Sequence, residues 1–224
     1  MRLIVFDCDG TLVDSQHLIV EAMGTAFAGL GLPVPARSRI LRHVGLSVAE
    51  AVAAISDSED EALIAALAAA YKSAFSGLRQ RPSFAEPFFP GMREAVETLA
   101  RDESVLLGIA TGKSRRGLDL LLQREELAYA FATLQTADDA PSKPHPEMLL
   151  RAMSETGIGP ADTVMIGDTS YDMAMARNAG AKAVGVAWGY HTARELTEAG
   201  AVAVAEDSAR LMALLAATQA VAAE

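Results

Sequence analysis

The chain has 224 residues, a net charge of −10 and a hydrophobic fraction of 51%. A composition this apolar predicts a packed globular protein and excludes an intrinsically disordered one. The acidic balance argues against general binding of nucleic acid, which needs clustered Lys and Arg, and no apolar run is long enough to cross a bilayer.

The first predicted strand, residues 3–6, ends in two carboxylates, Asp7 and Asp9, followed by Gly10. Side chains two residues apart on a strand point to the same side, so the two carboxylates start out facing together. Such a pair is expected where a cation lies between them, or where one attacks and the other carries a proton. An acidic turn at a strand end is the alternative. Cys8, between them, is predicted to point into the core.

Residues 16–80 are predicted to form a helical cap domain, inserted into a core domain made of residues 1–15 and 81–224. The helical spacing is seen in Leu63, Leu67, Tyr71, Phe75 and Leu78. The exit, residues 81–91, is rich in proline and predicts a stiff hinge about which the cap opens and closes. The alternative is a helical subdomain that does not move.

The rest of the chain alternates short apolar runs with helix-length segments. This pattern predicts an α/β core, a Rossmann-like parallel sheet with helices on both faces. Ligands then lie beyond the carboxyl ends of the strands. The predicted strands are residues 105–110, 163–166 and 183–187, and the predicted helices are residues 92–101, 115–124 with Ser114 as N-cap, 147–156, 171–179 and the alanine-rich 211–223.

Four short motifs occur in a fixed order along the chain: Asp7-x-Asp9-Gly10-Thr11, Thr111-Gly112, Lys143-Pro144 and Gly167-Asp168-x-x-x-Asp172. Together they resemble the motifs of the haloacid dehalogenase (HAD) superfamily. Residues 7–15, 110–116 and 185–191 are more specifically similar to its phosphoglycolate phosphatase group.

The resemblance implies a Mg²⁺-dependent phosphatase in which Asp7 attacks phosphorus and Asp9 is the general acid and base. Asp7, Asp168 and the backbone carbonyl of Asp9 would hold Mg²⁺, with Asp172 either a further ligand or, as we favour, a support for Lys143 or a metal-bound water. Thr111 and Lys143 would stabilise the transferring phosphoryl group. The candidate substrate-binding residues are Gly10, Thr11, Gly112, Lys113, Arg39, Arg42 and His43.

The expected substrate is a small phosphorylated metabolite, with 2-phosphoglycolate as the first candidate and Arg39, Arg42 or His43 pairing with its carboxylate. A helix face exposed to water explains these three residues equally well. The alternatives are a broad-specificity or pyrophosphate phosphatase and a phosphosugar mutase of the β-phosphoglucomutase type, which the missing arginine shortly after Gly45 disfavours. A dehalogenase does not need Asp9, and a non-catalytic binding module would have lost a motif residue.

The single cysteine excludes an internal disulfide and predicts a reducing cytoplasm. No membrane or nucleic-acid partner is expected. Whether the chain is a monomer or a homodimer stays open.

Overall fold

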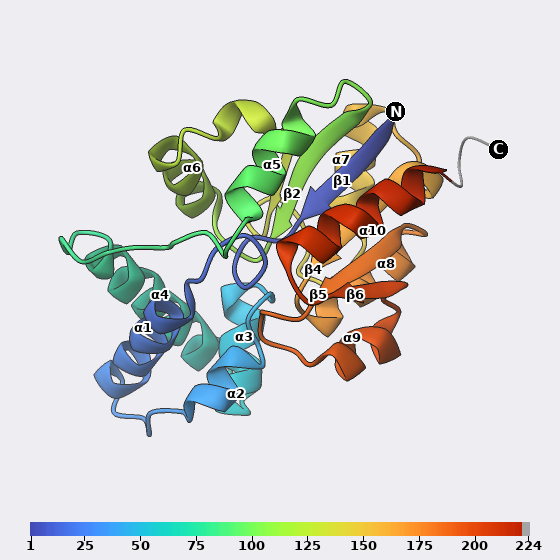
Figure 1. Cartoon of the computed structure of the whole chain (residues 1–224). Helices are drawn as coiled ribbons and strands as arrows, with labels where there is room; N and C mark the ends of the chain where they lie inside the picture. Colours follow the sequence, from blue (N-terminus) through green and yellow to red (C-terminus); the bar gives the residue numbers. More distant parts are fainter. Residues whose placement is uncertain (221–224) are drawn as a thin grey trace.

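The structure is a computed structural model that describes residues 1–220, within which six parallel strands form one sheet in the order β3-β2-β1-β4-β5-β6 (Figure 1). The strand order reverses at β1, which lies between β2 and β4. In an open parallel sheet, a crevice forms at this switch point, beyond the carboxyl ends of the strands. The strands are β1 (Arg2–Phe6), β2 (Val105–Thr111), β3 (Thr133–Thr136), β4 (Thr163–Gly167), β5 (Lys182–Val186) and β6 (Ala203–Ala205).

Helices cover both faces of the sheet because alternate strand residues point to opposite faces. Ile4 and Phe6 pack with α5, α6 and α10 in one hydrophobic cluster. Leu3 and Val5 pack with α7, α8 and α9 in another. The helices are α5 (Met92–Ala100), α6 (Arg115–Arg124), α7 (Glu147–Thr156), α8 (Ser170–Asn178), α9 (Ala193–Ala199) and α10 (Ser208–Ala220), with 3₁₀ turns at Ala128–Ala130 and Pro160–Asp162.

The segment between β1 and α5 contains four helices, which we call the helical insertion. They lie below the sheet in Figure 1 and have a hydrophobic cluster of their own. The two chain segments that join the insertion to the core are paired, since the Asp14 amide donates to the Pro87 carbonyl (2.8 Å) and the Phe89 amide to the Leu12 carbonyl (2.9 Å). The helices are α1 (Gln16–Gly29), α2 (Arg37–Leu41), α3 (Val48–Ser56) and α4 (Glu61–Leu78).

The predicted α/β class is confirmed, and the predicted strands and helices are found with ends shifted by at most a few residues. Ser114 is the N-cap of α6, accepting from the Gly117 amide, and Cys8 is fully buried. Strands β3 and β6 were not predicted, because β3 alternates with polar residues and β6 has only three residues. Helix α9 was also missed. Of the predicted final helix, residues 221–223 lie outside the described residues.

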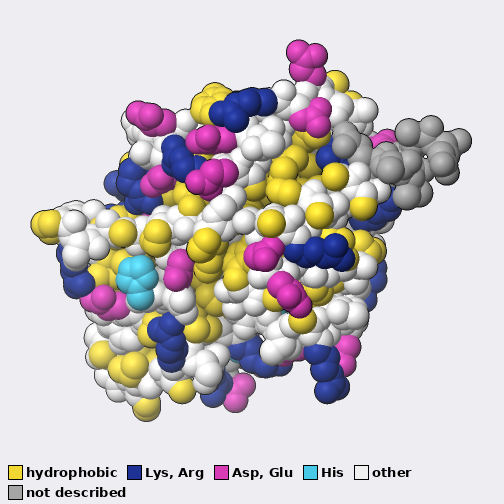
Figure 2. Space-filling view, in the orientation of Figure 1, with side chains coloured by type: hydrophobic (Ala, Val, Ile, Leu, Met, Phe, Trp, Pro, Cys, Tyr) yellow, Lys and Arg dark blue, Asp and Glu magenta, His cyan; other side chains and the backbone are white. Residues whose placement is uncertain are grey.

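Charges of both signs are interspersed on the face of the molecule shown in Figure 2. This face therefore carries no broad field of one sign. Over the described residues, no helix is both long and apolar enough to span a membrane.

Candidate active site

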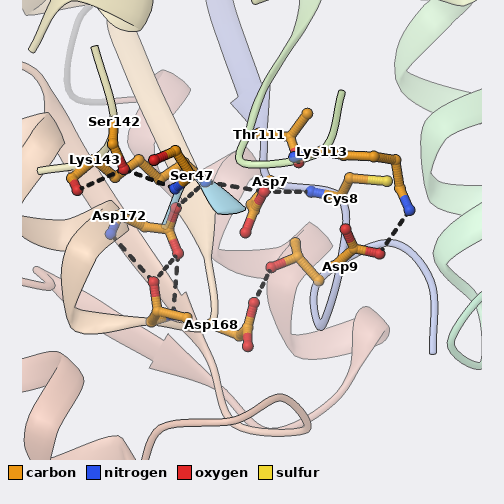
Figure 3. A network of polar contacts seen from close by, with 12 residues as sticks. Asp7, Cys8, Asp9, Ser47, Thr111, Lys113, Ser142, Lys143, Asp168 and Asp172 are labelled. Atoms are coloured by element: carbon orange, nitrogen blue, oxygen red, sulfur yellow. Dashed lines mark hydrogen bonds and ion pairs between the residues drawn. The ribbon is translucent and has the colours of Figure 1, made fainter. Parts of the chain in front are cut away.

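Asp7 follows β1 directly and lies at the centre of the polar network in Figure 3. Its side chain is 1% exposed. Oδ1 accepts hydrogen bonds from the Cys8 amide (2.7 Å) and from Lys143 Nζ (2.9 Å). Oδ2 is buried and has no hydrogen-bond partner among the described residues. Burial raises the pKa of the Asp7 carboxyl to about 7, against the opposing effect of the Lys143 ammonium.

Lys143 bridges two buried carboxylates. Its Nζ lies 2.9 Å from Asp7 Oδ1 and 2.6 Å from Asp172 Oδ1, and its side chain is fully buried. Burial by itself lowers the pKa of this ammonium, but the two carboxylates raise it above its ordinary value. The other carboxylate oxygen of Asp172 accepts from the amide (3.0 Å) and hydroxyl (2.6 Å) of Thr169, which closes a capping box at the start of α8. Asp172 therefore orients Lys143 from a rigid helix end.

Asp168 follows β4, and both of its carboxylate oxygens accept hydrogen bonds. Oδ1 accepts from the Thr11 hydroxyl (2.8 Å) and Oδ2 from the Tyr190 amide (2.9 Å). Burial raises its pKa well above the ordinary value, and the nearby carboxylates of Asp7 and Asp172 add to this. Gly10 has φ +92°, and a Cβ there would lie 2.3 Å from Asp168 Oδ2. The site therefore needs glycine at this turn, and the Thr11 hydroxyl is directed at Asp168.

Asp7, Asp168 and Asp172 each present an oxygen within 4.8 Å of the other two. Among the residues that the structure describes, the Lys143 ammonium is the one cation paired with this group of three carboxylates. Hard divalent cations such as Mg²⁺ prefer oxygen ligands. The unsatisfied Asp7 Oδ2, the carboxylate donors and the excess negative charge thus fit a bound divalent cation.

Asp9 lies on the other side of Asp7 in Figure 3 and belongs to a second network. Asp9 Oδ1 accepts from the Ser15 hydroxyl (2.5 Å) and pairs with Lys113 Nζ (3.0 Å). Lys113 Nζ also lies 2.8 Å from Glu86 Oε1. Both contacts of Asp9 use Oδ1, which leaves Oδ2 for a reacting group.

Glu86 is a buried carboxylate that sequence reasoning missed. It lies in the connecting segment after the insertion, is 3% exposed, and also contacts Arg124 at 3.6 Å. The one available signal was that it is the only acidic residue in the proline- and phenylalanine-rich stretch 81–91. Glu86 fixes the position of Lys113, and through it the position of Asp9.

Thr111 ends β2, Gly112 follows it, and both line the same cavity as Asp7 and Asp9. The Thr111 hydroxyl oxygen accepts from the Lys113 amide (3.2 Å). A Cβ on Gly112 would lie 2.5 Å from the Leu46 carbonyl oxygen, so this loop of the insertion approaches the core backbone too closely for a side chain. The insertion therefore covers the site.

Other contacts hold the insertion against the core. The Ser47 amide donates to the Ser142 hydroxyl (2.8 Å), and His43 Nδ1 lies 3.3 Å from the Tyr171 hydroxyl. Arg42 pairs with Glu195 on α9 (3.1 Å). These partners immediately precede Lys143 or lie on α8 and α9, so the insertion rests on the elements that carry the site.

The structure separates the three candidate carboxylate-binding residues of the insertion. His43 lines the cavity. Arg39 is exposed and donates to the Ala54 carbonyl (3.3 Å), and Arg42 is turned to Glu195. Neither arginine lines the cavity, because both are used in contacts elsewhere. Lys113 lines it, although its charge is already matched by two carboxylates.

The cavity between the core and the insertion has a volume of about 320 Å³. At its core end lie Asp7, Asp9, Thr111, Gly112 and Lys113; the insertion supplies mostly apolar side chains. A buried carboxylate, a second carboxylate and hydrogen-bond donors thus meet at one end of the cavity. This arrangement can carry out group transfer from an anionic substrate.

The model of the haloacid dehalogenase-like hydrolase family matches residues 4–186. Among curated proteins, the chain is 39% identical over 202 residues to "Probable phosphatase IndB" of Dickeya dadantii (88% of this chain, 86% of that one), and 29% identical over 208 residues to "Phosphoglycolate phosphatase 1" of Pseudomonas aeruginosa (88% and 73%). The crystal structure of a hydrolase from Pseudomonas syringae superposes with a TM-score of 0.83 at 30% identity, covering 96% of this chain and 98% of that one. The chain therefore belongs to the haloacid dehalogenase-like hydrolase family.

Proposed function

We propose that this chain is a Mg²⁺-dependent phosphatase that hydrolyses a phosphate monoester through an aspartyl-phosphate at Asp7. The observation that carries the proposal is the Asp7 carboxylate, buried, bound through Oδ1 to Lys143, and left with an unsatisfied Oδ2 at a cavity. The phosphatase names of the relatives support the same chemistry.

In the first step Asp7 attacks phosphorus, the bond between phosphorus and the ester oxygen breaks, and Asp9 gives its proton to the departing alkoxide. In the second step Asp9 takes a proton from the water that attacks the aspartyl-phosphate, which restores Asp7. Thr111, the Gly112 amide and Lys143 stabilise the charge on the phosphoryl oxygens. Lys113 and Glu86 hold Asp9 in place through the contacts at 3.0 and 2.8 Å.

Asp7, Asp168 and the backbone carbonyl of Asp9 would hold Mg²⁺, and Asp172 acts through Lys143 rather than on the ion. When bound, the ion neutralises charge on the nucleophile and the phosphate, so that two anions can approach. Residues 16–80 would act as a cap that opens to admit substrate and closes to exclude water, as the close contact of Leu46 with Gly112 supports. A reducing cytoplasm remains our proposed location, since Cys8 is a free thiol.

The substrate expected from the sequence is 2-phosphoglycolate, and it stays a prediction. The two arginines expected to meet its carboxylate lie outside the cavity. Pyrophosphate is disfavoured by the apolar lining, because its second phosphate would lose hydration without a matched cation. A phosphosugar mutase is disfavoured on the same ground, since sugar hydroxyls need hydrogen-bond partners.

The test is phosphate release from a panel of monoesters with and without Mg²⁺, together with acid trapping of phosphorylated protein. We expect release only with Mg²⁺, its loss on chelation by EDTA, and trapped phosphate on the unaltered protein. Asp7→Asn should lower kcat at least about 10³-fold, whereas Asp119→Asn, on the exposed face of α6, should not change it. Full release from the Asp7 variant, or undiminished release in EDTA, would refute the proposal.

A further inference from the structure

The wall that the helical insertion contributes to the cavity is mostly apolar, with His43 and Ser76 among its polar members. The side chains come from four different helices and the loop before α3, so the wall is a continuous surface rather than a single helix face. They include Met23, Ile40, Leu46, Ile55, Tyr71 and Phe75. A leaving group that departs from phosphorus at the core end must lie against this wall.

Four cationic residues line the cavity, and one of them is matched by carboxylates. Lys113 is paired with Asp9 and Glu86. Three other cationic residues line the cavity. Lys72 and Arg116 are exposed, which places them at its opening, and the half-buried Arg79 guanidinium lies 4.9 Å from the centre of the Phe75 ring. These cations can attract an anionic substrate to the cavity, while most of the wall stays apolar.

A short charged leaving group suits this surface poorly. The carboxylate of a glycolate group would lose water against the apolar side chains, and Lys113, the buried cation of the cavity, is already paired with two carboxylates. An apolar leaving group would shield the side chains of the wall from water, which is favourable. A flat ring can also pack against Tyr71 and Phe75, whose ring centroids are 5.9 Å apart.

We propose that the substrate is a phosphate monoester whose leaving group has an extended apolar or aromatic body, which the wall of the insertion binds. This proposal rests on the phosphatase activity proposed above. It names the class of substrate from the lining of this chain's own cavity, and it predicts that a small carboxylated ester is a poor substrate.

A series of straight-chain alkyl phosphates, from ethyl to hexyl, tests the proposal directly. The leaving alkoxides differ little in basicity, so changes in kcat/KM report contact with the wall rather than ease of bond cleavage. Each methylene that is buried should raise kcat/KM about two- to fourfold until the cavity is full. Hexyl phosphate should therefore exceed 2-phosphoglycolate by at least about tenfold.

A matched pair of variants locates the effect. Val48 lines the cavity at the start of α3, whereas Val34 is 60% exposed and is not among the residues that line the cavity. Val48→Arg should flatten the dependence on chain length and raise kcat/KM for 2-phosphoglycolate, and Val34→Arg should change neither. The series on the unaltered protein gives its answer even if a variant fails to fold.

Calorimetric binding of alkylphosphonates, which are not hydrolysed, separates this proposal from the proposed activity. If the affinity for alkylphosphonates rises with the length of the alkyl chain but no ester releases phosphate, the wall binds apolar groups as proposed and the phosphatase activity is refuted. Release that is flat with chain length, or greater for 2-phosphoglycolate than for hexyl phosphate, would refute the assignment and keep the activity. Absence of both binding and release would overturn the two together.

Discussion

The two ends of the cavity are built in opposite ways. At the core end, buried charges are held in place by ion pairs and hydrogen bonds, such as Lys143 between Asp7 and Asp172. At the insertion end, side chains such as Ile40 and Ile55 belong to a hydrophobic cluster and offer a ligand only shape and apolar surface. Charged groups stabilise a reaction that develops charge only if they are already held in position. An apolar wall instead favours ligands according to the apolar surface area that they bury against it. Our proposals therefore assign chemistry and substrate selection to different parts of the chain.

The largest effect should come from breaking the core end at Lys143. Lys143→Met leaves Asp7 and Asp172 buried without their shared cation, so the free energy of unfolding should fall by about 3–5 kcal/mol, and kcat should fall at least about 10²-fold. Urea denaturation and phosphate release measure the two effects. Lys182→Met, at an exposed position, is the control. Unchanged stability would mean that the buried carboxylates do not depend on this lysine.

Asp7 should make stability depend on pH when no divalent cation is present. Its folded pKa of about 7 lies above the unfolded value of about 4, so the folded state binds the proton more tightly and loses stability as the pH rises from about 4 to 7. Asp7→Asn does not titrate. In EDTA, the variant and the unaltered protein should be alike near pH 4, and the variant should be more stable by a few kcal/mol at pH 8.

Urea denaturation at several pH values measures this difference, with Asp119→Asn as the exposed control. Mg²⁺ should then stabilise the unaltered protein at pH 8 more than the variant, because an ion binds the ionised carboxylate of the folded state. A constant difference across the pH range would contradict the role of Asp7 as the titrating group.

Glu86 sharpens the comparison, since it supports the core end from the segment that joins the insertion to the core. Glu86→Gln should lower kcat about tenfold with little change in KM, and should shift the pH dependence of kcat, because Lys113 loses one of its two carboxylate partners. Glu94→Gln, on the exposed side of α5, is the matched control. A loss of stability without any change in the pH profile would make Glu86 only structural.

The smallest effect should follow from Arg42→Met. Its ion pair with Glu195 is partly exposed, so its loss should cost less than about 1 kcal/mol. The kcat/KM values for 2-phosphoglycolate and for an alkyl phosphate should change equally, within about threefold, and Arg39→Met should behave in the same way. A selective loss above about tenfold for 2-phosphoglycolate would restore Arg42 as the partner of its carboxylate.

The core end could be anticipated from the sequence because its residues follow strand ends. Apolar runs predict buried parallel strands, and the carboxyl ends of such strands meet at one edge, so Asp7, Thr111 and Asp168 had to lie close together. The contact partners of these residues were harder to predict from the sequence. Nothing in the spacing of Glu86 and Lys113, 27 residues apart, shows that they pair at 2.8 Å.

The sequence by itself determined the family, the α/β core and the residues that meet at the strand ends, because hydrophobic periodicity and ordered motifs are local properties. Only the tertiary structure decided where the insertion's side chains point. Arg42 and His43 are neighbours in sequence, yet one pairs with α9 and the other lines the cavity. On a short helix end, successive side chains point in different directions, and the packing of the insertion against the core decides which of them reaches the site.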